Sequence, residues 1–418
     1  MEEAARTARL AGMMAGVYGV QGAWWPVLAL HLNDLGVPGR ARGAIFGTLA
    51  MASLVTPVIA GQIADRRLAA QRLLALIYAL GTVVLVMLAR GWIPAAPLPL
   101  FVTFLGYWLM TAPASGLAST IAFRNLMRPA AQFGRVRMWG TVGWMAAGWV
   151  VTAVMGLRSQ TSAGVGAFEA FGVAAVVSAA LSLYCLTLPD TPPWPISDPT
   201  RRKAWELPDA SIGELLRRPG VGVLLAVALG VSLTTPFVYQ VVPAYLPSLG
   251  LPRSWVALAM SLGQVLEIAS LAVLPRLLGR LGFRRMLMAG MSAWVAYHGV
   301  MTLRPPLAVV LAALPIQGLA IALFHIAAAM YLDRQAPAER RATTQGLYLM
   351  TTTGLGNLLG SLLGGEMVER VGGAAAPVFG VPLAIDAVML AVFVAGFPRE
   401  GDSQAASGGG ESIRGRAR

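Results

Sequence analysis

The stretch Ser254–Leu278, "SWVALAMSLGQVLEIASLAVLPRLL", decides the fold class, because it is long and apolar yet holds a glutamate near its middle. A helix needs about 20 mostly apolar residues to cross the hydrocarbon core of a bilayer. Gln264 precedes Glu267 by three residues, which places both side chains on one helical face. A charge at that depth costs at least about 2.5 kcal/mol on insertion scales. The stretch therefore predicts a membrane helix with a functional polar face.

The composition of the whole chain also indicates a lipid environment. The 418 residues are 56% hydrophobic and 12% charged, whereas soluble domains carry roughly 25% charged residues. Arginine supplies nearly all of the net charge of +13, since Lys203 is the single lysine. The arginines lie between apolar runs and not on one folded face, which argues against a nucleic-acid partner. One cysteine, Cys185, excludes a disulfide framework and a cysteine-based metal site.

Twelve apolar segments follow one another along the chain. We place them at 10–33, 42–64, 70–90, 96–123, 136–157, 168–188, 219–246, 254–278, 284–303, 306–332, 342–368 and 375–397. They predict an all-α membrane protein with twelve transmembrane helices in two six-helix halves, residues 1–188 and 219–397. A Pro-rich cytoplasmic linker, 189–218, joins the halves and includes a candidate short amphipathic helix, "DASIGELLRR". We expect the low-complexity tail, 398–418, to be disordered and cytoplasmic.

Two of these segments, 96–123 and 306–332, are longer than a bilayer requires, so we expect tilt or kinks in them.

The arginines also predict the orientation of the chain. If the N-terminus is inside, most arginines fall on inner segments, and the outer loops keep only Arg40, Arg42, Arg90, Arg158, Arg253, Arg304 and Arg370. Positively charged residues concentrate on the cytoplasmic side of membrane proteins. We therefore expect a multi-pass protein of the inner (plasma) membrane with both termini in the cytoplasm.

Further polar and aromatic side chains within the predicted segments are candidates for a site. Besides Gln264 and Glu267, those for substrate binding are Arg137, Thr141, Gln21, Trp24, Trp25, Gln240, Gln317, Phe324, Thr353 and Asn357. The candidates for proton coupling are Glu267, His325 and Asp386, although the sequence names no partner for Asp386. Structural alternatives stay open: an inside anchor for Arg137, an interfacial aromatic belt for the tryptophans, and a hydrogen-bonded bundle residue for His325. For Glu267 the alternative is a structural carboxylic acid that is hydrogen-bonded to Gln264 or a backbone carbonyl oxygen.

The loop "GQIADRR", Gly61–Arg67, resembles the signature between the second and third helices of the major facilitator superfamily. Gly61 allows close helix approach, and Asp65 can cap a turn or pair with an arginine. Together with Arg66 they form a candidate conformational latch. The alternative is an ordinary positively charged inner loop.

Catalysis finds no support in the sequence. No Ser/His/Asp arrangement or metal-ligand cluster occurs, and His31, His298 and His325 fall on three different segments. We therefore expect a protein that is not an enzyme and that has no metal or cofactor.

Five motifs, taken together, carry a closer resemblance. They are "QGAWW" (21–25), "GQIADRRLAA" (61–70), "RMWGTVGW" (137–144), "GQVLEIA" (263–269) and "RATTQGLYLMTTTGLG" (341–356). The chain resembles the nucleoside:proton symporter family of bacterial major facilitator proteins. The resemblance implies a monomer with a central cavity that binds a nucleoside and a proton, with Arg137, Thr141, Gln264 and Glu267 at binding positions. Trp24, Trp25 or Phe324 would then offer an aromatic face to the nucleobase.

One stretch departs from that family. "IQGLAIALFHI" (316–326) carries Ala322 where the family has an acidic residue, with Gln317 and Ile321 in place of aromatics. Glu267 remains as a proton site, and His325, one turn from Ala322, is a candidate replacement. The leading hypothesis is import of a small polar solute, most simply a nucleoside, by proton symport with alternating access. An importer or exporter of another organic solute, such as an aromatic acid or drug, is the alternative. A transporter-derived sensor or membrane enzyme ranks last.

Overall fold

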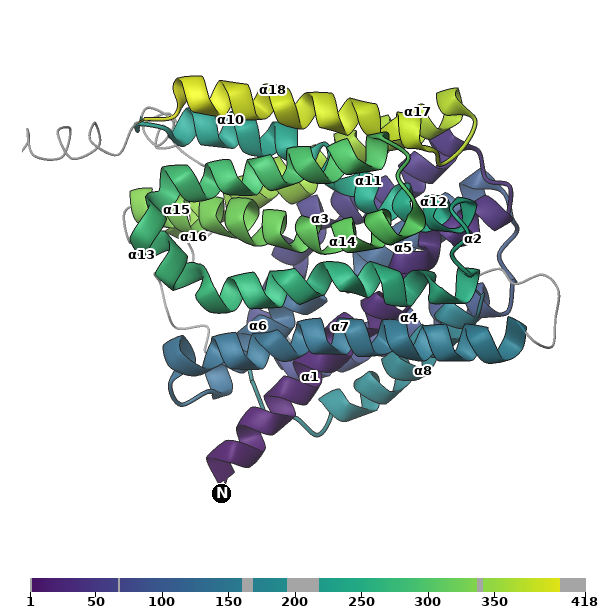
Figure 1. Cartoon of the computed structure of the whole chain (residues 1–418). Helices are drawn as coiled ribbons and strands as arrows, with labels where there is room; N and C mark the ends of the chain where they lie inside the picture. Colours follow the sequence, from purple (N-terminus) through teal and green to yellow (C-terminus); the bar gives the residue numbers. More distant parts are fainter. Residues whose placement is uncertain (1, 67, 160–167, 194–217, 337–340, 399–418) are drawn as a thin grey trace, which may run out of the picture.

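A computed structural model describes residues 2–66, 68–159, 168–193, 218–336 and 341–398 (Figure 1). In these ranges the chain forms helices joined by short turns and contains no strand, which confirms the all-α prediction. Most of the predicted linker, with the segment "DASIGELLRR" up to residue 217, and the tail from residue 399 onward lie outside the described residues.

The first group of helices comprises the elements before residue 188. They are α1 (Glu2–Trp24), η1 (Trp25–Val27), α2 (Leu28–Asp34), α3 (Gly39–Arg66), α4 (Ala70–Ala89), α5 (Pro97–Thr111), α6 (Ala114–Asn125), α7 (Pro129–Ser159) and α8 (Phe168–Cys185). Within this group α1 packs along α7 and α8, and α4 packs along α8.

The second group comprises the elements after residue 220. They are α10 (Val221–Ser232), α11 (Thr235–Gln240), α12 (Val242–Ser248), η3 (Arg253–Trp255), α13 (Val256–Thr302), α14 (Leu307–Ala320), η4 (Ile321–Ile326), α15 (Ala327–Gln335), α16 (Arg341–Leu349), η6 (Met350–Gly356), α17 (Asn357–Val371), η7 (Ala376–Phe379) and α18 (Gly380–Gly396). Here α13 packs on α14, η4 and α18, and α10 packs on α18.

Two prolines and one glycine lie at breaks in the helices. Pro26 lies in the 3-10 turn that ends α1, and Pro113 separates α5 from α6. Gly282 has a positive φ of 71° inside α13 and so divides that element into the two predicted segments 254–278 and 284–303. The irregularity expected in 96–123 lies at Pro113, and that expected in 306–332 is the π-helical turn η4.

Several segments of the described chain are long and apolar enough to span a membrane. They are Ala70–Ala89, Pro97–Asn125, Gln132–Leu157, Phe168–Cys185, Val221–Gln240, Arg253–Thr302, Leu307–Gln335 and Ala376–Gly396. Large apolar side chains are exposed along these helices, for example Val83, Leu157 and Val176. Lipid can cover these side chains, which supports a multi-pass membrane protein.

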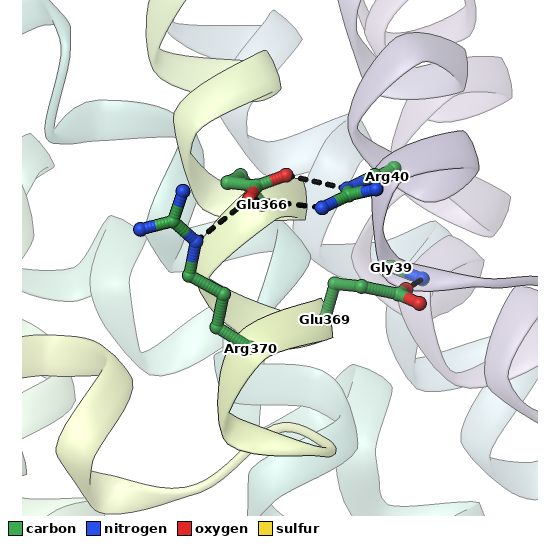
Figure 2. Close-up of polar contacts among 5 residues, drawn as sticks. All are labelled: Gly39, Arg40, Glu366, Glu369 and Arg370. Carbon is green, nitrogen blue, oxygen red and sulfur yellow. Dashed lines mark hydrogen bonds and ion pairs between the residues drawn. The ribbon is translucent and has the colours of Figure 1, made fainter.

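The two groups meet closely where α3 begins and α17 ends (Figure 2). A Cβ atom at Gly43 would lie 2.5 Å from the Ser361 carbonyl oxygen, and one at Gly365 would lie 2.6 Å from the Gly39 carbonyl oxygen. Only glycine permits this backbone approach, as in other packed membrane helices. We call this contact the α3–α17 seal.

Polar contacts surround the α3–α17 seal. The Gly39 N–H donates to Glu369 Oε2 at 2.5 Å, and Glu366 accepts from Arg40 Nε and Arg370 Nε, both at 2.7 Å (Figure 2). The same end holds an ion pair between Arg253 and Asp34.

The groups also touch along α7 and α13. The Leu258 N–H donates to Thr152 Oγ1 at 3.1 Å, and Trp149 Nε1 donates to Ser261 Oγ at 3.1 Å. These contacts lie near the end of α7 and the start of α13, so the two groups are joined at the Gly39 end of the bundle.

Tight packing of α1 on α7 yields a stability prediction. A Cβ at Gly143 would overlap the Ala15 carbonyl group, whereas one at Gly172 on α8 would meet nothing within 4 Å. Gly143→Ala should therefore destabilise the protein by about 1–3 kcal/mol through overpacking. Gly172→Ala should leave stability unchanged or raise it by up to about 1 kcal/mol through helix propensity. Thermal unfolding of the two purified variants in detergent measures both effects, and equal melting temperatures would contradict this packing.

Candidate functional site

Arg137 and Glu267 lie within electrostatic range of each other between the two groups of helices. Arg137 on α7 places its guanidinium over the Tyr18 ring, 4.0 Å from the centroid. Glu267 on α13 is close enough to Arg137 for an electrostatic interaction across the interface. Both side chains are partly exposed, so they can meet a solute from water. Opposite charges at membrane depth stabilise each other and mark ion or substrate pathways.

Gln264 and Tyr239 form a hydrogen-bonded unit beside this pair. The amide of Gln264 is oriented so that its nitrogen faces hydrogen-bond acceptors. This nitrogen donates to the carbonyl oxygens of Met260 at 3.1 Å and Ser261 at 3.2 Å. Its amide oxygen remains for the Tyr239 hydroxyl, which hydrogen-bonds with Gln264. Tyr239 also lies near Glu267. The unit therefore offers a fixed amide and a phenol next to a carboxyl group.

Aromatic rings surround Tyr239. Its ring centroid lies 6.2 Å from that of Trp25 and 6.3 Å from that of Trp144. Tyr239 comes from α11, Trp25 from η1 and Trp144 from α7, so both groups contribute. The sequence did not single out Tyr239 or Trp144, because nothing in an apolar run separates an aromatic residue of a site from one of the core. We call Arg137, Glu267, Gln264, Tyr239, Trp25 and Trp144 the interface cluster.

The two predicted tryptophans have different environments. Trp25 is 8% exposed and lies beside Tyr239. Trp24 is 0% exposed, and its ring is enclosed by Phe104, Tyr107, Trp108 and Phe171 at centroid distances of 5.5–5.6 Å. Trp24 therefore has the contacts of a core residue.

A cavity of about 190 Å³ adjoins the interface cluster. Its lining includes the predicted residues Gln21 and Thr353, together with Tyr18, Trp108 and Thr111. Tyr18 also contacts the Arg137 guanidinium, so the cavity and Arg137 share one neighbouring side chain. Space for part of a solute therefore lies next to the interface cluster.

Gln317 on α14 lies against Gly263, one turn before Glu267. Its Oε1 atom is buried and accepts no hydrogen bond from the described residues. Gln240, in contrast, packs toward Gly364 on α17. Thr141 and Asn357 are partly exposed on α7 and α17.

The π-helical turn η4 contains most of the stretch 316–326, in which the sequence differs from the family it resembles. Phe324 and Ala322 are both fully buried, and Phe324 packs against Gly290 of α13. His325 is partly exposed, and the Tyr348 hydroxyl donates to its carbonyl oxygen at 3.0 Å. Phe324 therefore presents no free face.

Asp386, for which the sequence named no partner, has two. Its Oδ2 lies 2.7 Å from His298 Nδ1, and its Oδ1 lies 3.0 Å from Thr234 Oγ1. All three side chains are buried. The sequence could not pair them because the residues are far apart in the chain.

The predicted latch residues Gly61, Asp65 and Arg66 belong to α3, but their side chains lie outside the described part of the structure. Their role stays a prediction. Among the described residues, no three His, Cys, Asp or Glu side chains gather as metal ligands would.

Known proteins resemble this chain over nearly its whole length. It is 28% identical to the putative nucleoside transporter YegT of Escherichia coli (strain K12) over 417 residues, 95% of each chain. It is 25% identical to the nucleoside permease NupG of the same organism over 368 residues, 83% of this chain and 84% of the permease.

Solved structures show the same fold. A crystal structure of the nucleoside transporter NupG superposes with a TM-score of 0.78 at 21% identity, covering 94% of this chain and 99% of that one. A D-xylose–proton symporter superposes with a TM-score of 0.70 at 12% identity, covering 94% and 98%. The fold is therefore shared by transporters of different solutes. A family model described as "Nucleoside H+ symporter" matches residues 4–401, and the chain belongs to that family.

Proposed function

We propose that this protein imports a nucleoside together with protons, through alternating access to a site between two six-helix halves, residues 1–188 and 219–397. Family membership makes it a transporter and not an enzyme. The observation that carries the proposal is the interface cluster, in which Arg137 of the first half lies within electrostatic range of Glu267 of the second.

The residues of the interface cluster suit the two parts of a nucleoside. Ribose hydroxyls accept hydrogen bonds from the Arg137 guanidinium and donate to Glu267 or the Gln264 oxygen. A nucleobase stacks on aromatic faces, which Trp25, Tyr239 and Trp144 supply. We propose that Thr141, Gln21, Gln317, Thr353 and Asn357 line the rest of the path. Trp24, Phe324 and Gln240 are left out, because their contacts belong to helix packing.

Twelve membrane helices remain our proposal for the architecture. Eight segments qualify by length and composition, and one of them, Arg253–Thr302, contains two helices separated at Gly282. The helix α1, the helix α3 and the run from α16 to α17 supply the other three.

Orientation follows from the arginine distribution. We propose a monomer in the inner (plasma) membrane with both termini in the cytoplasm and no nucleic-acid partner. The α3–α17 seal then closes the outer side, and the conformation is one that receives or releases solute on the cytoplasmic side. The proposed latch of Gly61, Asp65 and Arg66 would lie at that cytoplasmic end.

The first test replaces Glu267. In liposomes, wild type should accumulate labelled uridine when the outside is acidic. Glu267→Gln keeps the side-chain size but cannot bind and release a proton, so gradient-driven accumulation should fall by about tenfold or more. Glu3→Gln, at the N-terminal end of α1, is the control and should behave like wild type. A folded, monodisperse wild type that moves no uridine would overturn the nucleoside assignment and direct attention to other organic solutes.

Tyr239 offers a second test, on binding. Tyr239→Phe keeps the ring but leaves the Gln264 oxygen without its donor, so the KM for uridine should rise by about 2- to 10-fold. Tyr239→Ala also removes the stacking face and should cost more. Tyr184→Phe is the matched control, because Tyr184 donates to the Arg9 carbonyl oxygen away from the interface cluster. Equal KM values for the Tyr239→Phe and Tyr184→Phe variants would exclude the Tyr239 hydroxyl from the binding site.

A third test concerns the α3–α17 seal. Ser361 is buried there, so Ser361→Cys in a Cys185→Ala background reports opening through its rate of maleimide labelling. Adding Glu366→Gln and Glu369→Gln should raise that rate severalfold, since exposed ion pairs contribute only modestly and the glycine packing remains. Asp333→Asn, at an ion pair on α15, should leave the rate unchanged. An unchanged rate in the double variant would show that the polar contacts do not hold this end closed.

A further inference from the structure

The group formed by Asp386, His298 and Thr234 lies outside the interface cluster. Asp386 is 0% exposed on α18, His298 is 0% exposed on α13, and Thr234 is 0% exposed between α10 and α11. Enclosing a carboxyl, an imidazole and a hydroxyl group together inside a membrane bundle costs free energy. Replacing such a group by well-packed apolar residues is often neutral or stabilising. Stability alone therefore gives no reason for this group to exist.

The hydrogens of the group can be assigned so that every short contact is satisfied. Three short contacts need a hydrogen: Thr234 Oγ1 to the Val231 carbonyl oxygen at 2.7 Å, Thr234 Oγ1 to Asp386 Oδ1 at 3.0 Å, and His298 Nδ1 to Asp386 Oδ2 at 2.7 Å. Thr234 has one hydroxyl hydrogen, and a carbonyl oxygen can only accept. If Thr234 donates to Val231, the contact with Asp386 needs a hydrogen from Asp386.

The neutral form of His298 completes this pattern. Its Nδ1 then donates to Asp386 Oδ2, while its Nε2 carries a lone pair and no hydrogen. Among the described residues Nε2 is buried and has no hydrogen-bond partner, which suits an unprotonated nitrogen better than a charged N–H. All three contacts are satisfied when Asp386 holds one proton on Oδ1. The group is then uncharged, as its enclosed position favours.

The elements packed on this group contribute few other titratable side chains. The residues of α10 and η7 include none. On α13, Tyr297 adjoins His298, and Arg284 binds the Val394 and Phe397 carbonyl oxygens at the far end of α18. The Trp294 ring lies near both His298 and His325 of η4. Its centroid is 5.5 Å from that of His298, on which it stacks, and 6.4 Å from that of His325.

A line of polar side chains leads from this group toward the interface cluster. Tyr297 follows Trp294 on α13, and its ring lies 5.1 Å from that of His298. Its hydroxyl is buried without a hydrogen-bond partner in the described chain. Tyr239 lies near Tyr297, and Glu267 lies near Tyr239. Tyr297 and Tyr239 are therefore the neighbouring side chains that connect the Asp386 group with Glu267.

We propose that Asp386, with His298 and Thr234, is a second proton-binding site of this transporter, loaded with one proton in this conformation and unloaded during the transport cycle. The proposal rests on the proposed function, since it assigns a source for the coupled proton. One proton leaves Asp386 Oδ1 for water or for an ionised Glu267, and the carboxylate that remains keeps the His298 N–H as its donor. Reloading from the acidic side restores the neutral group.

Transport assays distinguish a role of Asp386 in proton coupling from a role in folding or stability. Asp386→Asn keeps the shape of the side chain and a neutral state but cannot release a proton. It should retain uridine exchange without a gradient within about twofold of wild type, while gradient-driven accumulation falls by about tenfold or more. A merely structural role would lower exchange and accumulation together, and that result would overturn the proposal. Asp333→Asn on α15 is the control and should affect neither.

Infrared spectroscopy tests directly whether Asp386 is protonated, and this test does not depend on which solute is transported. Wild type in lipid should show a protonated-carboxyl band that is absent from Asp386→Asn and present in Asp333→Asn. That band should change when uridine and a proton gradient are supplied. If Asp386→Asn does not fold, His298→Gln should shift the same band, because it alters the donor to Oδ2. The proposal would be overturned if wild type lacked this band. It would also be overturned if a variant lost the band and still coupled uridine accumulation to the proton gradient. Failure of wild type to move uridine, with the band present and titrating, would refute only the nucleoside assignment.

Discussion

The absence of water from the bilayer interior is the constraint on which this structure depends. Every backbone N–H and C=O at that depth must find a partner inside the protein, which favours helices throughout. The same constraint acts on side chains, since an unpaired buried charge is costly. Arg137 accordingly lies within electrostatic range of Glu267, and Asp386 is hydrogen-bonded with His298 and Thr234. These two polar groups are therefore the candidates for function.

Contact between the two groups of helices is concentrated at one end. Glycines at positions 39, 43 and 365 let the α3 and α17 backbones touch, and only then can the Gly39 N–H reach Glu369. The surrounding ion pair of Arg40 with Glu366 is largely exposed and therefore weak. A seal built from close backbone packing and weak polar contacts can open without breaking a strong interaction, as alternating access requires.

The sequence predicted much of the interface cluster but not all of it. Gln264 and Glu267 stand out because polar side chains are rare at the centre of an apolar run. Tyr239 gave no such signal, because aromatic residues are as common in lipid-facing and core positions as in binding sites. Trp24 and Trp25 looked equivalent, yet the helix ends between them and turns one ring into the core and the other toward Tyr239. Side-chain direction at a helix break depends on backbone geometry, which apolar periodicity does not encode.

The sequence by itself determined the fold class, the helical segments and the family, because segment length, hydrophobicity and short motifs are local properties that can be counted along the chain. The tertiary structure alone decided the partners: Glu267 with Arg137, Gln264 with Tyr239, and Asp386 with His298 and Thr234. Those pairings join residues on different helices, so they depend on which helical faces meet. In a bundle whose helices are all apolar, hydrophobicity does not choose those faces, and close packing and hydrogen bonding do.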